Sequence, residues 1–227
     1  MKKILAVFVV AALLFCTGCS STSKEKAPSN YEQLHGLIGK PITEACKELG
    51  LDEAEVLAAN QRKEDYKLPD AVEFAGIIWD VYLSFDWEQE AVLAFLYVRD
   101  YGSDVKQSAE DAAKLAVHLV EHYGERAGLP DNVESLTDKN ALHLNQLSAE
   151  ELYRMIQDAD YFSRQEIWDL KDQITDTMRS FHEEAIKDYT GEYVPRNQLY
   201  EMNLKYAAKY EEFARITLEY RFRALYY

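Results

Sequence analysis

The clearest pattern of apolar and polar positions lies in residues 72–100. Apolar and polar side chains alternate over residues 79–85, which is the period of a strand with one buried face. A polar turn separates this run from the apolar, largely β-branched and aromatic residues 92–98. The pattern therefore predicts an antiparallel β-hairpin over residues 72–100.

A second alternation covers residues 214–223 near the C-terminus. It favours a half-buried strand, because apolar and polar side chains exchange at every position. Apolar residues also recur every seven positions across the same region, which favours a helix, at Leu199, Tyr206, Phe213 and Tyr220. We predict a helix over residues 198–212 and then a terminal strand that pairs with the hairpin, since a third strand stabilises a two-stranded sheet.

Helical spacing and capping residues dominate the remaining segments. Residues 31–60 predict two short helices, with Gly50 ending the first and Asp52 capping the second. A further helix follows the hairpin and ends at Gly124. Helices therefore flank the hairpin on both sides in the sequence.

Residues 131–212 are predicted to be mainly helical. Ser148 with Glu151, and Ser163 with Glu166, have the spacing of capping boxes. The second box would open a long amphipathic helix with an apolar stripe at Ile167, Leu170, Ile174, Met178, Phe181 and Ala185.

Together these patterns predict an α+β fold. A small antiparallel sheet, made of the hairpin 72–100 and a strand at 214–223, is packed by helices. The expected domain is single, spans residues 31–227 and carries a helical insertion over residues 131–212. Residues 72–130 also combine the hairpin with a helix that ends in a Tyr-Gly turn. This layout resembles that of small envelope domains of the β-lactamase-inhibitor-protein type, which implies a domain that binds other proteins or has no assigned activity.

The N-terminus has the pattern of a secretory signal. Lys2 and Lys3 precede an apolar run over residues 4–15, which is too short to span a bilayer. The run leads to Cys16-Thr17-Gly18-Cys19, and small residues before a cysteine resemble the lipobox of bacterial lipoproteins, although Cys16 departs from the usual leucine. An ordinary secretory signal followed by a chance cysteine is the alternative.

The lipobox resemblance implies that residues 1–18 are removed as a signal peptide and that Cys19 carries the lipid. Diacylglycerol on the thiol, often with a further acyl chain such as palmitate on the amine, would hold the chain on the extracytoplasmic face of the cell membrane. Residues 19–30 are polar and predict a flexible tether. In such a mature chain Cys46 is the one unmodified cysteine, and its helical neighbours predict a buried, inert thiol.

Composition narrows the possible functions. The chain carries 25 basic and 40 acidic residues, a formal net charge of −15, so we expect no nucleic-acid partner. It has no P-loop, no dinucleotide-binding glycine motif, no nucleophile elbow and no Cys-x-x-Cys pair, and no cofactor is predicted. Its C-terminus is rich in tyrosine, and the basic residues Arg215, Arg221 and Arg223 share one side of the terminal strand. These residues either form core and surface ion pairs or receive a partner.

One motif has the spacing of a metal site. His118, Glu121 and His122 form an H-x-x-E-H pattern, which resembles that of inverzincin metallopeptidases. Histidines four positions apart share a helix face and can bind one zinc ion, with the glutamate as general base. A third ligand would be needed, for example Glu183 or Glu184. The alternative is that these residues are solvated positions beside an apolar stripe.

We therefore expect a membrane-anchored envelope lipoprotein that is not an enzyme and binds an envelope protein or polymer. The alternatives are a zinc-dependent hydrolase that uses His118, Glu121 and His122, and a solute-binding protein.

Overall fold

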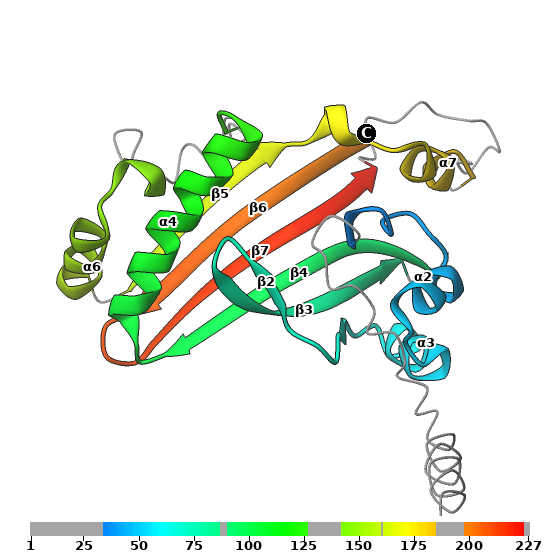
Figure 1. The fold of residues 1–227 in the computed structure, drawn as a ribbon, viewed down its shortest axis with the longest axis horizontal. Helices are drawn as coiled ribbons and strands as arrows, with labels where there is room; N and C mark the ends of the chain where they lie inside the picture. The colour runs from blue at the N-terminus through cyan, green and yellow to red at the C-terminus, as the bar shows by residue number, and fades with distance from the viewer. Residues whose placement is uncertain (1–33, 87–89, 127–141, 160, 185–197, 225–227) are drawn as a thin grey trace, which may run out of the picture.

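The computed structural model describes residues 34–86, 90–126, 142–159, 161–184 and 198–224 (Figure 1). The helical elements are α2 (Ile42–Leu49), α3 (Glu53–Gln61), α4 (Val105–Tyr123), η1 (Leu144–Gln146), α6 (Ala149–Asp158), η2 (Lys171–Gln173) and α7 (Asp176–Glu184). The strands are β1 (Tyr66–Lys67), β2 (Val72–Phe74), β3 (Ile77–Asp86), β4 (Ala91–Gly102), β5 (Phe162–Asp169), β6 (Gln198–Lys209) and β7 (Phe213–Ala224). The α+β class with an antiparallel sheet is confirmed.

The strands form a seven-stranded sheet in the order β1-β3-β4-β7-β6-β5, with β2 added to β3. The predicted hairpin is present as β3 and β4, which pair antiparallel. The terminal strand is also present and pairs with β4, so that Tyr97 lies opposite Leu218 and Asp100 opposite Arg215. The sheet is therefore larger than predicted, because strands from both ends of the chain join it.

The prediction of a helical segment over residues 131–212 was wrong in two places. β5 replaces the start of the long amphipathic helix, and β6 replaces the helix over residues 198–212. The capping box at Ser163 does not form, because Ser163 lies within β5 and Glu166 is buried in an ion pair. The other box does form, at the start of α6, where Ser148 and Glu151 cap each other.

A charged residue at a core position makes β5 hard to recognise in the sequence. The side chains that β5 turns toward the core include Phe162, Glu166 and Trp168, so a carboxylate interrupts the apolar alternation. In β6 every second side chain from residue 200 to residue 208 is buried, and Asn203 between them is buried as well. The seven-residue spacing that includes Tyr206 favoured a helix instead and masked this alternation.

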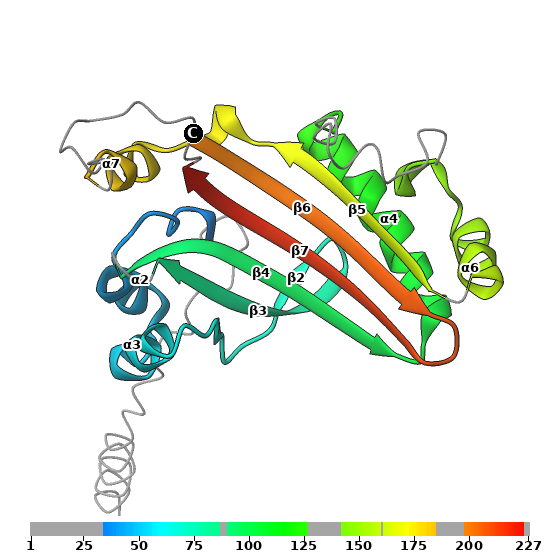
Figure 2. The same cartoon turned by 180° about the vertical axis from the view of Figure 1, so that it is seen from behind.

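The two faces of the sheet differ. One, which we call the covered face, turns its side chains toward α4 and toward residues 34–38, and includes the buried residues Phe95, Tyr97, Leu218, Tyr220 and Phe222. Figure 1 shows α4 lying across the strands on this side. The opposite face, the open face, is seen in Figure 2, where no helix crosses the middle of β4, β7 and β6. Within the described residues, the large apolar side chains of the core therefore lie mainly on the covered face.

α4 sits close to the covered face and is fixed there by hydroxyl groups. Its inner side buries small residues, including Ala109, Ala112 and Ala116, which allow the helix to approach the strands closely. The hydroxyls of Ser108 and Tyr206 are 2.8 Å apart and share a hydrogen bond, and burial raises the pKa of Tyr206 to about 12. Near the other end of α4, the hydroxyls of Tyr123 and Tyr220 are 3.2 Å apart.

The first described residues, 34–38, pack against the covered face of the sheet. Leu34, Leu37 and Ile38 are buried in the core. The following residues pair with β4, because the Gly39 amide donates to the Val92 carbonyl at 2.8 Å and the Val92 amide donates to the Lys40 carbonyl at 3.0 Å. Gly39 has φ of +86°, and a Cβ there would lie 3.1 Å from the Met178 Cα. Glycine is thus required for α7 to pack on this segment.

A half-buried histidine lies where the N-terminal segment meets the sheet. His35 Nδ1 is 3.0 Å from the Tyr200 hydroxyl, and the His35 ring centroid is 4.1 Å from that of Tyr220. Burial lowers the pKa of His35 from 6.5 to about 4. The folded protein therefore holds this imidazole neutral at pH values where an unfolded chain would protonate it.

This shift makes the fold sensitive to acid. Between pH 6.5 and pH 4 the unfolded chain binds a proton at His35 that the folded chain does not, so the free energy of unfolding falls as the pH falls, by up to about 3 kcal/mol. In His35→Asn, which keeps a polar side chain beside Tyr200 but does not titrate, the fall over this range should be smaller. Urea unfolding at several pH values measures it in both proteins.

The comparison of the two proteins isolates the histidine. Carboxyl groups such as Asp100, whose pKa is lowered chiefly by its hydrogen bond with Arg215, also cost stability in acid, but both proteins carry them. Equal pH dependence in the two proteins would contradict the prediction.

Candidate functional site

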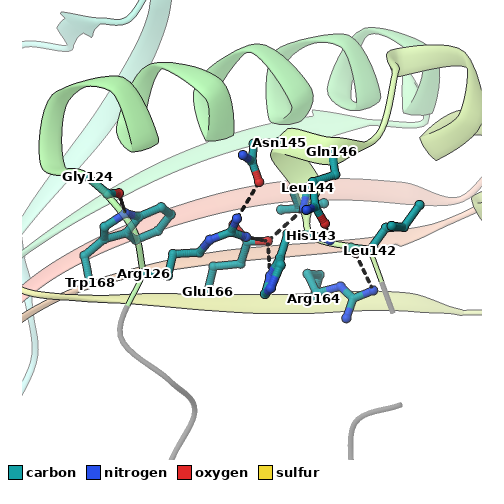
Figure 3. Close-up of polar contacts among 10 residues, drawn as sticks. All are labelled: Gly124, Arg126, Leu142, His143, Leu144, Asn145, Gln146, Arg164, Glu166 and Trp168. Atoms are coloured by element: carbon teal, nitrogen blue, oxygen red, sulfur yellow. Dashed lines mark hydrogen bonds and ion pairs between the residues drawn. The ribbon is translucent and has the colours of Figure 1, made fainter. Parts of the chain in front are cut away.

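A buried ion pair joins β5 to the chain after α4 (Figure 3). The carboxylate of Glu166, whose side chain is 1% exposed, lies 2.8 Å from the Arg126 guanidinium. The same oxygen, Oε1, accepts the backbone amide of Leu144 at 2.8 Å, and His143 Nδ1 is 3.5 Å away from it. Arg126 in turn donates to the side-chain carbonyl of Asn145. One carboxylate oxygen thus gathers groups from two separate segments.

These segments lie on either side of residues 127–141, which are outside the described residues. Two more contacts hold them to β5: the Trp168 indole donates to the Gly124 carbonyl at 3.2 Å, and Arg164 donates to the Leu142 carbonyl at 3.2 Å. β5 is the outermost strand of the sheet on this side. We call the set Arg126, Leu144, Arg164, Glu166 and Trp168 the clamp, because it holds chain segments against an edge strand, which needs protection from unwanted pairing.

The clamp is not fully hydrogen bonded. Among the described residues, Glu166 Oε2 and Arg164 Nε are buried without a hydrogen-bond partner, and Arg126 Nη1 makes its ion pair without hydrogen-bond alignment. Each unpaired buried polar atom costs about 1–3 kcal/mol. No local sequence pattern indicates this cluster, because Arg126 and Glu166 belong to distant segments and Glu166 has the spacing of a helix cap.

The open face carries an apolar band. Tyr82 lies opposite Leu96, and Val98 lies beside them on the same face. Ile78 extends the band and is 58% exposed, the most exposed of the large apolar side chains in the described chain. In the described chain no helix lies over this part of β3 and β4 (Figure 2). Asp80 lies between Ile78 and Tyr82 on β3 and opposite Val98, so the four apolar residues form a band that one carboxylate interrupts.

Charges surround this band and are already paired within the sheet. Lys67 lies 2.8 Å from Asp80, and Arg215 lies 2.7 Å from Asp100. Further across the face, Glu219 contacts Lys205 at 3.4 Å and Arg221 at 2.9 Å. The predicted basic row of the terminal strand is thus paired at Arg215 and Arg221, while the side chain of Arg223 lies outside the described part. The described basic side chains named here are therefore each paired with a carboxylate.

The residues of the proposed metal motif lie on α4. His118 and His122 are neighbours on one flank of the helix, with ring centroids 6.2 Å apart. Glu121 is exposed on the adjoining surface. No group of three or more histidine, cysteine, aspartate or glutamate side chains in the described chain is arranged to hold a metal ion. Glu183 and Glu184 end α7, which both views place well away from α4 (Figures 1 and 2).

Cys46 is the one cysteine within the described residues, and it has the buried thiol that the sequence predicts. Cys46 is buried and unpaired, and burial, together with the charges of Glu53 and Asp52, raises the pKa of its thiol to about 11. Such a thiol is a poor nucleophile. Cys19, the predicted lipidation site, lies outside the described residues. Within the described chain, every helix is too short or too polar to cross a bilayer.

The tyrosine-rich C-terminus contributes chiefly to the core. Tyr200, Tyr206 and Tyr220 are each at most 1% exposed. Tyr226 and Tyr227 lie outside the described residues. The core interpretation of these tyrosines is confirmed for the three that are buried.

The clamp predicts a large cost for removing its charge. Glu166→Gln keeps the shape of the side chain but leaves Arg126 buried without a counter-charge, which should lower the free energy of unfolding by about 3–5 kcal/mol. Arg126→Gln should cost a similar amount, and the double variant should be clearly more stable than the sum of the two losses predicts. Urea unfolding measures all three.

An exposed ion pair provides the matched control. Asp80→Asn removes the partner of Lys67 on the open face, where both side chains are about half exposed, and should change stability little. Strict additivity of the two clamp substitutions would show that Arg126 and Glu166 do not depend on each other.

No protein-family model matches the sequence, no curated protein is significantly similar to it, and no solved structure matches its fold.

Proposed function

We propose that this chain is a lipid-anchored envelope protein that binds another envelope protein through the open face of its sheet. The observation that carries the proposal is the apolar band of Ile78, Tyr82, Leu96 and Val98, which no helix of the described chain covers and which paired charges border. Apolar patches with polar rims are typical of protein-binding surfaces. The anchor rests on the lipobox resemblance around Cys19.

The pairing of charges on the open face indicates the chemistry of the partner. Each basic side chain described on this face already has an acidic neighbour, so a strongly charged partner would have to break ion pairs to bind. A partner surface that is apolar at its centre and polar but uncharged around it fits without that cost. Tyr82 is well suited to the centre of such an interface, because tyrosine combines a large apolar ring with a hydrogen-bonding hydroxyl.

Two potentially reactive side chains among the described residues have structural surroundings. The buried carboxylate of Glu166 has one oxygen shared among several donors, which suits a structural clamp better than an acid–base catalyst. Cys46 is buried, and its pKa is raised. We therefore propose no reaction for this chain.

Site-specific cross-linking in a bacterial host tests the docking surface. A photoreactive phenylalanine analogue at Tyr82 should give a discrete adduct with a protein partner when the full chain is expressed in the envelope. The control position is Val117, an apolar side chain on α4 that is 42% exposed but lies away from the open face. Leu96→Lys should abolish the Tyr82 adduct by placing a charged side chain in the band, on β4 opposite Glu219, with the circular dichroism spectrum unchanged.

Two outcomes would contradict the docking surface: no adduct from Tyr82, or adducts of equal yield from Tyr82 and Val117. The anchor has a separate test. Cys19→Ser should move the protein from the membrane fraction to the soluble fraction, and a protein that stays with the membrane would contradict the proposed lipidation.

A further inference from the structure

We propose that β5 is a self-association edge, at which two copies of this chain pair antiparallel and join their sheets into one. β5 is the outermost strand on its side of the sheet (Figure 2). The two-fold axis passes beside Gln165, so that Gln165 of each copy lies opposite its counterpart. This edge is separate from the apolar band on β3 and β4, and the inference does not depend on the proposed function.

β5 turns one set of backbone groups outward from the sheet. The Leu170 amide donates to the Tyr200 carbonyl at 2.7 Å, which fixes the hydrogen-bonding phase of β5 against β6. Because hydrogen bonding alternates along an antiparallel pair, the even-numbered residues of β5 bond to β6 and the odd-numbered residues face outward. Ser163, Gln165 and Ile167 thus present their amides and carbonyls at the edge. Within the described chain, no backbone group bonds to that outward side.

The clamp leaves the backbone of this edge accessible. It holds β5 through the side chains of Arg164, Glu166 and Trp168, and none of these contacts goes to the outward amides or carbonyls. Ser163 and Gln165 are exposed. β5 also lacks the lysine, the proline and the bulge with which exposed edge strands commonly resist pairing. The strand is therefore a template on which another strand can pair.

The side chains of β5 select a second copy as the strand that fits. With Gln165 on the two-fold axis, Arg164 lies opposite the partner's Glu166, and Phe162 lies opposite the partner's Trp168. Side chains directly opposite each other on one face have Cβ atoms about 4.5–5.5 Å apart, and opposite charges or aromatic pairs at that spacing stabilise a sheet. Charged side chains on the inner face disfavour pairing with an apolar strand, but they match an inverted copy of themselves.

Two polar atoms of β5 support this register. Arg164 Nε and Glu166 Oε2 are buried, and neither has a hydrogen-bond partner in the described chain. One is a donor and the other an acceptor, so antiparallel pairing brings complementary groups to the same place on both sides of the axis. Both atoms have already lost their contact with water in the single chain, so joining them costs little further desolvation.

The symmetry of the pairing limits the assembly to two copies. Gln165 exchanges two backbone hydrogen bonds with its counterpart, and Ser163 does so with the partner's Ile167. The same surface is used by both copies, so the interface closes on itself and leaves no β5 edge free for a third copy. The open faces of the two sheets then lie on the same side of one continuous sheet.

Disulfide cross-linking of the full chain, purified in detergent and oxidised in air, tests the register. Gln165→Cys places two thiols across the axis with Cα atoms about 5.5 Å apart, which a disulfide can span. We expect a linked dimer on a non-reducing gel that the parent protein does not give. Ser163→Cys is the matched control, because the register holds its two copies roughly 13 Å apart along the strands. Adding Ile167→Cys to Ser163→Cys should restore the linked dimer.

Sedimentation of the full chain in density-matched detergent tests the role of the backbone. The parent protein should have the mass of two copies. Gln165→Pro should have the mass of one, because proline removes an outward amide while the bonds to β6 remain. Gln165→Thr keeps the amide at the same position and should remain a dimer. Circular dichroism confirms that both variants are folded.

Three outcomes would overturn the proposal. The first is a parent protein that sediments as a single copy. The second is equal yields of linked dimer from Gln165→Cys and Ser163→Cys, which would mean that the contact has no register. The third is a Gln165→Cys adduct with a different protein in place of a second copy, since the edge would then belong to a strand of that protein.

Discussion

The pairing of β4 with β7 is the interaction on which the rest of the structure depends. It joins residues more than a hundred positions apart, as the hydrogen bond between Arg215 and Asp100 illustrates with a separation of 115. Without it the chain would hold two unconnected sets of strands, β1 to β4 and β5 to β7. Closing so long a loop costs entropy, although the cost grows slowly with length. The alternating apolar residues of β7, which are buried along the covered face, offset that cost.

The elements that pack on the covered face explain why tyrosine is frequent in the core. The covered face must accept both α4 and the N-terminal segment, and tyrosine fills the space while its hydroxyl reaches a polar atom of the element above. Tyr206 meets Ser108 of α4, and Tyr200 meets His35. A purely apolar face would bury the same surface but would define the position of the covering elements less sharply. The polar contacts thus select one packing among several that apolar contact alone would allow.

The sequence predicts those parts of the fold whose signal is local. Alternation identified β3 and β7, Gly50 and Asp52 marked helix ends, and Ser148 with Glu151 marked the start of α6. β5 was missed because Glu166 occupies a core position, and only its distant partner Arg126 makes that burial tolerable. A single sequence does not reveal such pairs. The open face was equally hidden, because whether a helix covers a sheet is decided by tertiary packing, whereas the spacing of His118 and His122 could be read directly.

The place where the N-terminal segment enters the sheet also has a mechanical consequence. Residues 39–42 pair with the start of β4, and β4 is also the strand that β7 joins. Any pull on the chain ahead of Leu34 is therefore transmitted to the centre of the sheet instead of to a peripheral helix. Backbone hydrogen bonds at Gly39 and Val92 would carry that load first, together with the packing of α7 on Gly39. A pull at Leu34 is thus resisted through β4, a strand that is paired on both of its sides.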